Sequence, residues 1–160
     1  MKIKNRHQLK SKEIRYILKE LSTRFSTSLF SSSSSVERGT LDDYSIILVD
    51  NEIDFFKIGE KIFFTLKGLY RFQPQQYAVT VDMGAVGFVV KGADVMAPGI
   101  IEADNDIAKN DIVWIRDETH KKPLAVGIAL LSGEEMVSTH QGKAIKNIHY
   151  IGDTLWNFSH

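Results

Sequence analysis

The sequence predicts an α+β protein built from two small domains, residues 1–75 and residues 76–160. Three observations lead to this prediction. Apolar residues recur at helical spacing near the N-terminus, three strand-like runs follow between residues 44 and 66, and the second half holds short apolar runs separated by turns. With 43% hydrophobic residues, a chain of 160 residues can bury the cores of two such domains.

The first predicted element is a helix. Its apolar residues follow the i, i+3, i+4, i+7 spacing of a helix face that packs on a core. They are Ile14, Ile17, Leu18, Leu21 and Phe25. Residues 26–35 are rich in serine and break this pattern, so we expect a mobile loop there and assign it no function.

Three strands are predicted next, over residues 44–49, 53–58 and 61–66. Asp50-Asn51-Glu52 and Gly59-Glu60 have the composition of tight turns between them. The first domain is therefore expected to pack a helix on an antiparallel meander. Residues 68–76 are expected to connect the two domains.

The second domain contains an unusual concentration of small residues between Val81 and Gly99. Asp82 can cap a helix that extends to about residue 90 or 91, and Gly92 can supply the left-handed residue that ends it. Residues 93–96 are expected to form a short strand and Pro98-Gly99 a turn. Such a surface fits either a shallow groove for a sugar-phosphate backbone or tight packing of a helix on a sheet.

Local signals place two further elements in the second domain. Residues 118–122 have the composition of a polar hairpin loop. Ser132 and Glu135 fit the Ser-x-x-Glu capping box at the start of a helix, which we expect to end at Gly142. Short strands interrupted by turns are typical of a small barrel.

Residues 78–160 resemble a PUA domain, the RNA-binding module named after pseudouridine synthases and archaeosine transglycosylases. The resemblance begins with Val-Asp-x-Gly-Ala at residues 81–85 and Gly-Ala-x-Val-x-x-Pro-Gly at residues 92–99. Later segments resemble the middle strand, the next strand with its following helix, and the closing strands of that module. They are residues 111–115, 125–129 with 132–136, 143–150 and 153–156. The resemblance implies a PUA β pseudo-barrel with short helices.

The ending Asn147-Ile-His-Tyr-x-x-Asp-x-Leu-Trp156 narrows this resemblance. It is similar to the malignant-T-cell-amplified-sequence family and the homologous N-terminal part of ligatin, with their archaeal relatives. These are translation factors with a small domain ahead of the PUA domain. The resemblance implies that the PUA domain contacts a tRNA acceptor end or another RNA end, during initiation or recycling. It also implies that the N-terminal domain docks on the small ribosomal subunit in the cytoplasm, with a further translation factor as a possible partner protein.

The residues that match the family's groove form the expected RNA-binding site. They are Phe88, Lys91, Gly92, Ala93, Asp94, Met96, Pro98 and Gly99, with Lys143 and His149 as further candidates on the closing strands. Gly92 and Ala93 would let RNA approach the backbone, whereas Lys91 would meet a phosphate and either Asp94 or exposed backbone N–H and C=O groups would read a base edge. For an aromatic residue in the middle of a helix, such as Phe88, a core position is the commoner role.

Charge suggests a second surface. The chain has no net charge, but residues 1–24 hold eight Lys and Arg against two Glu, and the remainder carries a net charge of −6. Lys12, Arg15 and Lys19 fall on one face of the predicted helix, which we expect to face the ribosome. An ordinary solvated helix face explains the same pattern.

Motifs of catalysis and metal binding are not found in the sequence. No phosphate-binding lysine follows a glycine run, no Gly-x-Ser-x-Gly elbow occurs, and there are no cysteines. The five histidines lack metal-ligand spacing, and His149 with Asp153 is better explained by a structural hydrogen bond, or by simple exposure, than by an acid–base pair. We therefore expect no enzyme, cofactor or metal. The apolar runs are also shorter than the ~20 residues of a membrane span.

Two other functions remain open. The chain could target an RNA-modification enzyme to its substrate, or it could be an adaptor whose glycine-rich groove packs against another protein. Association with small ribosomal subunits, with a modification enzyme, or with no RNA at all would distinguish these readings.

Overall fold

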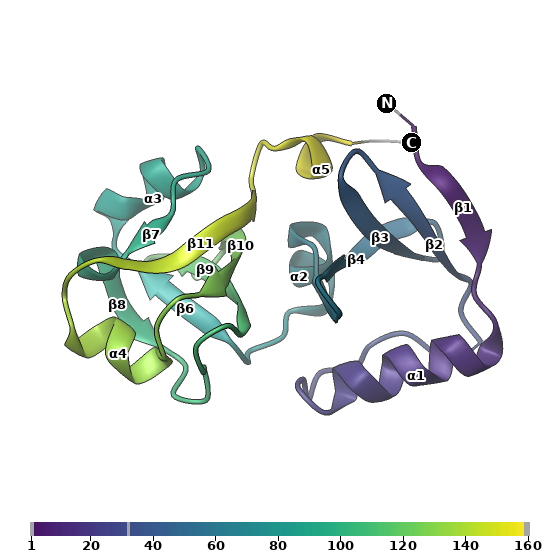
Figure 1. Cartoon of the computed structure of the whole chain (residues 1–160), viewed down its shortest axis with the longest axis horizontal. Helices are drawn as coiled ribbons and strands as arrows, with labels where there is room; N and C mark the ends of the chain where they lie inside the picture. Colours follow the sequence, from purple (N-terminus) through teal and green to yellow (C-terminus); the bar gives the residue numbers. More distant parts are fainter. Residues whose placement is uncertain (1, 32, 159–160) are drawn as a thin grey trace. The chain divides into compact units, whose positions relative to one another are not determined.

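The computed structural model describes residues 2–31 and 33–158, so Ser32 of the serine-rich segment and the histidine at position 160 lie outside the described residues. The chain divides into two compact units between Gln75 and Gln76 (Figure 1). Each unit contains its own sheet. The α+β fold class is confirmed.

The N-terminal unit is built on a five-stranded antiparallel sheet with the strand order β1-β2-β3-β4-β5. The strands are β1 (Lys4–Gln8), β2 (Val36–Leu41), β3 (Tyr44–Val49), β4 (Glu52–Ile58) and β5 (Lys61–Phe64). Asp50 and Asn51 both have positive φ angles, 49° and 71°, as a two-residue hairpin turn requires. The turn predicted between β3 and β4 is therefore correct.

Helix α1 (Ser11–Ser22) follows the predicted pattern. It buries Ile14, Ile17 and Leu21, and Phe25 lies just beyond its end with 2% of its surface exposed. The Phe25 ring meets the edge of Phe64, with ring centroids 4.9 Å apart, in an aromatic core that also contains Phe55 and Phe63. Edge-to-face aromatic pairs stabilise a core beyond the area that they bury.

Three features of this unit differ from the sequence-based expectation. Strands β1 and β2 were not predicted, because every residue of β1 is exposed and the two strands carry mostly polar residues. Residues 68–76 were predicted to be a connector, but helix α2 (Leu66–Phe72) occupies most of that segment. Thr65 caps this helix by accepting a hydrogen bond from the Gly68 N–H.

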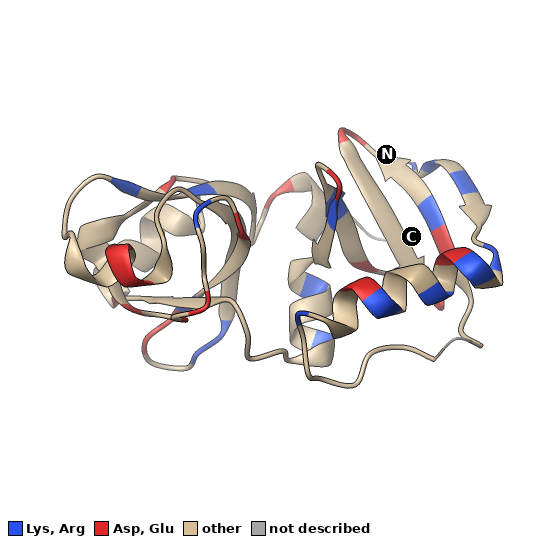
Figure 2. Cartoon of the chain, turned by 60° about the horizontal axis from the view of Figure 1, so that its bottom comes forward, with Lys and Arg blue, Asp and Glu red and all other residues tan. Residues whose placement is uncertain are grey.

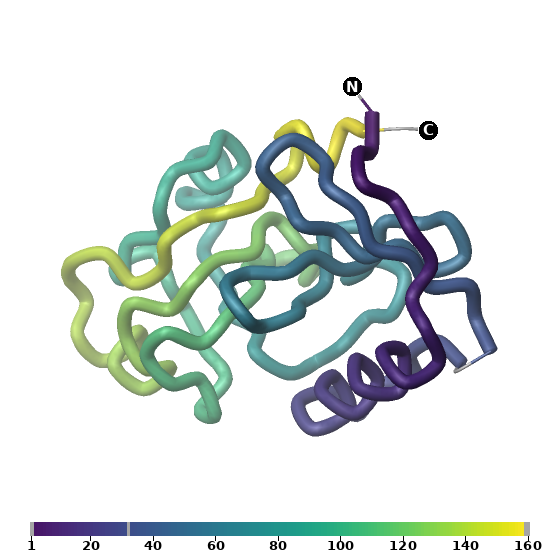
Figure 3. Tube along the Cα trace, turned by 45° about the vertical axis from the view of Figure 1, so that its right-hand side comes forward, coloured from purple at the N-terminus to yellow at the C-terminus, as the bar shows by residue number. Residues whose placement is uncertain are grey.

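The C-terminal unit is a six-stranded curled sheet with the order β7-β11-β10-β9-β6-β8. Its strands are β6 (Ala78–Val81), β7 (Val95–Met96), β8 (Ile100–Ala103), β9 (Ile112–Asp117), β10 (Pro123–Ala129) and β11 (Lys143–Tyr150). Strands β6 and β9 pair in parallel, and the other neighbours are antiparallel. Figure 3 shows β11, coloured green to yellow, passing the teal segment that contains β7.

Helix α3 (Met83–Val89), the 3₁₀ turn η1 (Ala97–Gly99) and helices α4 (Gly133–Ser138) and α5 (Thr154–Asn157) complete this unit. The predicted capping box at Ser132 and Glu135 is present at the start of α4. Two predictions are wrong. Helix α4 ends at Ser138, before Gly142, and the expected last strand is helix α5, because Asp153 caps it by accepting a hydrogen bond from the Trp156 N–H.

Candidate nucleic-acid interface

A groove of about 630 Å³ opens between helix α3 and the segment that contains β7 and η1. Small residues form much of its wall and leave the backbone accessible. The lining residues are Asp82, Gly84, Ala85, Phe88, Val89, Ala93, Asp94, Val95, Met96, Pro98, Gly99 and Lys143. The groove is therefore mostly apolar, with charged groups at only three positions.

Two large apolar side chains of the groove are open to solvent. Phe88 is 69% exposed and Met96 is 46% exposed. Phe88 therefore does not occupy the core position that is usual for an aromatic residue in the middle of a helix. The short helix α3 packs on the sheet through Val89, which is 1% exposed, and leaves the Phe88 ring outside the core.

The turn after α3 carries the chain from the helix to the far wall of the groove. Gly92 has a φ of +91°, and its N–H donates to the Val89 carbonyl at 3.0 Å. The Ala93 N–H donates to the Phe88 carbonyl at 3.1 Å. This pair of hydrogen bonds around a left-handed glycine is a Schellman motif, so the prediction that Gly92 ends the helix is correct.

Gly92 itself does not line the groove. A Cβ atom at this position would stand 2.8 Å from two ring carbons of Tyr150, on β11. The Tyr150 ring therefore covers the side of Gly92 where a side chain would be. The structure gives no support to the expected direct approach of RNA to this residue.

Asp94 and Lys143 form an ion pair at the wall of the groove, with 3.3 Å between Lys143 Nζ and Asp94 Oδ2. Asp94 Oδ1 accepts a hydrogen bond of 2.9 Å from the backbone N–H of Asn147. The bond from Asn147, and next the one from Lys143, hold the pKa of Asp94 below its ordinary value. Asp94 is therefore an anion at neutral pH, fixed on both of its oxygens.

His149 does not reach the groove, because its side chain is only 1% exposed. Its Nδ1 lies 2.7 Å from Asp153 Oδ2, an oxygen that also accepts a hydrogen bond from the Tyr150 N–H. Burial is the largest single effect and opposes the charged form of Asp153, but the interaction with His149 and the hydrogen bonds from the Trp156 and Tyr150 N–H groups together outweigh it, so the pKa of Asp153 is lowered. The structural reading of this pair fits the geometry, and we leave His149 out of the proposed surface.

Seven of the ten candidate RNA-binding residues line the groove. They are Phe88, Ala93, Asp94, Met96, Pro98, Gly99 and Lys143, whereas Lys91, Gly92 and His149 lie outside the lining. Lys91 is exposed and directly precedes the Schellman glycine. Five lining residues were not predicted, although all of them lie in the segment from Val81 to Gly99: Asp82, Gly84, Ala85, Val89 and Val95.

The two units differ in charge. Residues 1–75 hold 13 Lys and Arg against 9 Asp and Glu, which gives +4, and residues 76–160 hold 7 against 11, which gives −4. Lys12, Arg15 and Lys19 are exposed on α1. Figure 2 shows acidic segments on the same helix. A second groove beside this helix is lined by residues that include Lys12, Tyr16 and Arg38.

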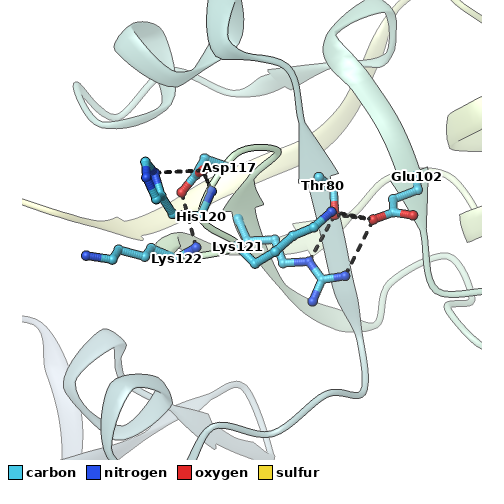
Figure 4. Close-up of polar contacts among 7 residues, drawn as sticks. Thr80, Glu102, Asp117, His120, Lys121 and Lys122 are labelled. Atoms are coloured by element: carbon cyan, nitrogen blue, oxygen red, sulfur yellow. Dashed lines mark hydrogen bonds and ion pairs between the residues drawn. The ribbon is translucent and has the colours of Figure 1, made fainter.

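A polar network also crosses strands β8, β6 and β9, where Thr80 is paired with Glu102 on one side and with Arg116 on the other. Figure 4 labels Thr80 and Glu102 in this network. Arg116 Nε donates to the Thr80 hydroxyl at 2.9 Å, and Lys121 Nζ lies 2.9 Å from Glu102 Oε1. Hydrogen bonds from Lys121 and Thr80 lower the pKa of Glu102. Thr80, Glu102, Arg116 and Lys121 are not among the residues that line the groove, so the network does not extend it.

Among residues 2–31 and 33–158, no group of three or more His, Asp or Glu side chains could hold a metal ion. Within the same residues, no helix is long and apolar enough to cross a membrane.

Two known families match the chain, and the boundary between their matches lies near the division between the two units. Residues 77–151 match the PUA domain, and residues 5–72 match a domain of unknown function, DUF1947.

Several known proteins are similar over most of the chain. An uncharacterized protein of Methanocaldococcus jannaschii is 47% identical over 160 residues, which cover 99% of both chains. Translation machinery-associated protein 20 of Saccharomyces cerevisiae is 36% identical over 124 residues, 74% of this chain and 68% of the yeast protein. Malignant T-cell-amplified sequence 1 of Rattus norvegicus is 35% identical over 119 residues, 70% of this chain and 64% of the rat protein.

Solved structures agree with this assignment. A hypothetical protein from Pyrococcus horikoshii is 34% identical with a TM-score of 0.86, and the match covers 94% of this chain and 97% of that one. A conserved PUA domain protein from Thermoplasma acidophilum is 28% identical with a TM-score of 0.78 and the same coverage.

Proposed function

The chain belongs to the PUA-domain family that includes translation machinery-associated protein 20 and malignant T-cell-amplified sequence 1, and from this membership we propose that it holds an RNA end during translation. In this proposal an unpaired end, such as the acceptor end of a tRNA, lies in the groove beside α3. The N-terminal unit docks on the small ribosomal subunit through Lys12, Arg15 and Lys19.

The observation that carries this proposal is the exposed Phe88 ring in an apolar groove with small-residue walls. Proteins that recognise unpaired RNA stack bases on exposed aromatic rings. In this proposal Lys143 at the wall of the groove and Lys91, two residues before Ala93 of that wall, meet the phosphates that flank such a base.

The charge of the two units supports a division of labour. The N-terminal unit carries +4, which favours association with the polyanionic ribosome. The C-terminal unit carries −4 and would bind RNA mainly through stacking and a few placed contacts. We also propose that the protein acts in the cytoplasm as a binding factor and catalyses no reaction.

Phe88→Ala tests the groove, with Tyr16→Ala as the matched control. Tyr16 is 70% exposed, almost the same as Phe88, but it lies on α1 of the other unit. The measurement is the dissociation constant for an RNA hairpin with a single-stranded 3′ end. Loss of one stacked base should weaken binding about 5- to 100-fold in Phe88→Ala. Equal binding by Phe88→Ala, Tyr16→Ala and the wild type would overturn the proposed site.

An adaptor function is the second candidate, because Met83 and Ile101 are also exposed, at 51% and 50%. Exposed apolar side chains close to a groove are common at protein-binding surfaces. This candidate predicts no RNA binding even at low salt. A role in targeting an RNA-modification enzyme would instead show as RNA binding without association with ribosomal subunits.

A further inference from the structure

The side chain of Asn147, on β11, joins two carbonyl groups at the end of helix α3. Its Nδ2 donates to the Val89 carbonyl at 3.1 Å and to the Ala93 carbonyl at 3.0 Å. The backbone N–H of the same residue donates to Asp94 Oδ1 at 2.9 Å. One residue thus makes three hydrogen bonds to a segment more than 50 positions earlier in the chain.

These bonds fix the Schellman turn from outside. The Val89 carbonyl already accepts the Gly92 N–H, and the Asn147 amide adds a second donor to it. The Ala93 carbonyl, just beyond the turn, receives the other amide proton. An amide supplies two donors from one nitrogen, whereas a carboxylate of the same size supplies none. The two bonds therefore depend on the amide group of Asn147.

The oxygen of the same amide group is less well placed than its nitrogen. Asn147 Oδ1 is buried and has no hydrogen-bond partner among the described residues. An unsatisfied buried acceptor is destabilising, so the two donors of the Asn147 side chain are kept at a cost in folding stability.

The fixed segment is a wall of the groove. Ala93 and Asp94 both line it, and Val95 and Met96 continue it as β7, which pairs only with β11 in this sheet. We propose that Asn147 is a positioning residue for the RNA groove: by bonding Val89, Ala93 and Asp94 it sets the distance between the Phe88 side of the groove and the opposite wall. This inference rests on the proposed function for its effect on RNA, but its effect on the turn can be measured without RNA.

The first experiment measures amide hydrogen exchange in the free, full-length protein. In Asn147→Ala, exchange of the Gly92 and Ala93 N–H groups should accelerate about tenfold or more, because the turn loses both external donors. Asn157→Ala is the matched control, since the Asn157 amide donates to the Gly152 carbonyl at 2.9 Å outside the groove. Exchange within about twofold of the wild type in a folded Asn147→Ala protein would overturn the proposal. If that variant does not fold, Asn147→Ser, which keeps one hydroxyl donor, replaces it and is read in the same way.

The second experiment compares RNA affinity with stability. Met136→Ala removes a fully buried side chain of α4 but none of the hydrogen bonds that Asn147 makes, and so provides a variant of lowered stability. At a temperature where all variants are folded, Asn147→Asp should weaken RNA binding about tenfold, because it replaces two donors with a carboxylate facing two carbonyls. Met136→Ala should bind like the wild type. Equal losses of RNA affinity in these two variants would show that Asn147 affects binding only through the stability of the unit, and the positioning role would be wrong.

Failure of this inference and failure of the proposed function give different results. If the wild type binds no RNA and exchange at Gly92 and Ala93 still accelerates in Asn147→Ala, the proposed function is wrong and the positioning of the turn stands. If Phe88→Ala loses RNA binding while Asn147→Asp does not, the groove stands and the positioning role is wrong.

Discussion

The ring of Tyr150 lies against the bare face of Gly92, where a Cβ atom would stand 2.8 Å from two of its carbons. Two constraints therefore meet at Gly92: a φ of +91° and a neighbouring ring. The first favours glycine at the end of any helix of this type, and the second is specific to this unit. The contact brings together residues from two segments of the chain that flank the groove.

We expect Gly92→Ala to lower the free energy of unfolding of the C-terminal unit by about 2–3 kcal/mol. Gly142→Ala is the control, since Gly142 has a φ of +83° but no heavy atom within 4 Å of an added Cβ. Gly142→Ala should cost only about 1 kcal/mol, the strain of the positive φ alone. Denaturant unfolding of both variants measures the difference. Equal costs would mean that the Tyr150 ring moves aside freely.

The salt dependence of RNA binding should be shallow. Lys143 at the groove wall and Lys91 outside the lining are the cations proposed to meet phosphates, and for a single strand each neutralised phosphate contributes a slope of about −0.7 in log affinity against log salt. We expect a slope of about −1.4 for the wild type and about −0.7 for Lys91→Ala. Lys109→Ala, outside the groove lining, should keep the wild-type slope. A much steeper slope would indicate that other cations of the chain also meet the RNA.

Reversing the basic face of α1 should separate the two proposed activities. The triple substitution Lys12→Glu, Arg15→Glu, Lys19→Glu should abolish co-sedimentation with small ribosomal subunits, because all three side chains are exposed cations on one helix face. Binding of an isolated tRNA should stay within about threefold, since the substituted residues belong to the other unit.

A second triple variant controls for net charge. Lys2→Glu, Lys4→Glu, Lys61→Glu changes the charge of the same unit equally at exposed positions off the helix. It should retain most of the subunit association. Equal loss of subunit association in both triple variants would point to nonspecific attraction. Loss of tRNA binding in the helix variant would show that the N-terminal unit takes part in RNA recognition.

The stability of the N-terminal unit should fall as pH rises, because of Asp54. Burial raises the pKa of this carboxyl to about 6 against the opposing attraction of Arg71, whose Nη1 lies 2.9 Å from Asp54 Oδ2. The folded state therefore holds the proton more tightly than the unfolded state, and stability is lost between about pH 4 and pH 6.

Asp54→Asn measures this effect. The amide cannot ionise, so the variant should gain stability relative to the wild type as pH rises from 4 to 7, by about 3 kcal/mol at most. Urea unfolding at several pH values gives the difference. A difference that does not vary with pH would show that Asp54 titrates normally in the folded protein.

Elements with a strong local signal could be predicted from the sequence. The spacing of Ile14, Ile17 and Leu21 predicts α1, and the capping pairs at Asp82 and Ser132 place the starts of α3 and α4. Strand β1 gave no such signal, because all of its residues are exposed and no alternation of apolar and polar residues marks it. Pairing with β2 stabilises β1 as a strand, and this neighbour is not visible locally.

The candidate site shows the same limit. The residues of the groove came from a motif within one continuous segment, so most of them could be named in advance. The surroundings of Gly92 and His149 depend on Tyr150 and on helix α5, which pack from elsewhere in the unit. The sequence identified Asn147 as part of a family motif but did not predict its contacts, because its three hydrogen bonds reach residues 53 to 58 positions away.

Strand β11 also determines when the groove can exist during synthesis. Strand β7 is at the edge of its sheet, and its one neighbour there is β11, through the pairs Val95–Ile145 and Met96–Lys143. A nascent chain that ends before residue 143 has therefore made α3 and Gly92 but lacks the strand that pairs with β7. Because translation proceeds from the N-terminus, the N-terminal unit can fold first and the groove is completed last. A ribosome-bound precursor should consequently be unable to capture RNA in this groove until β11 has emerged.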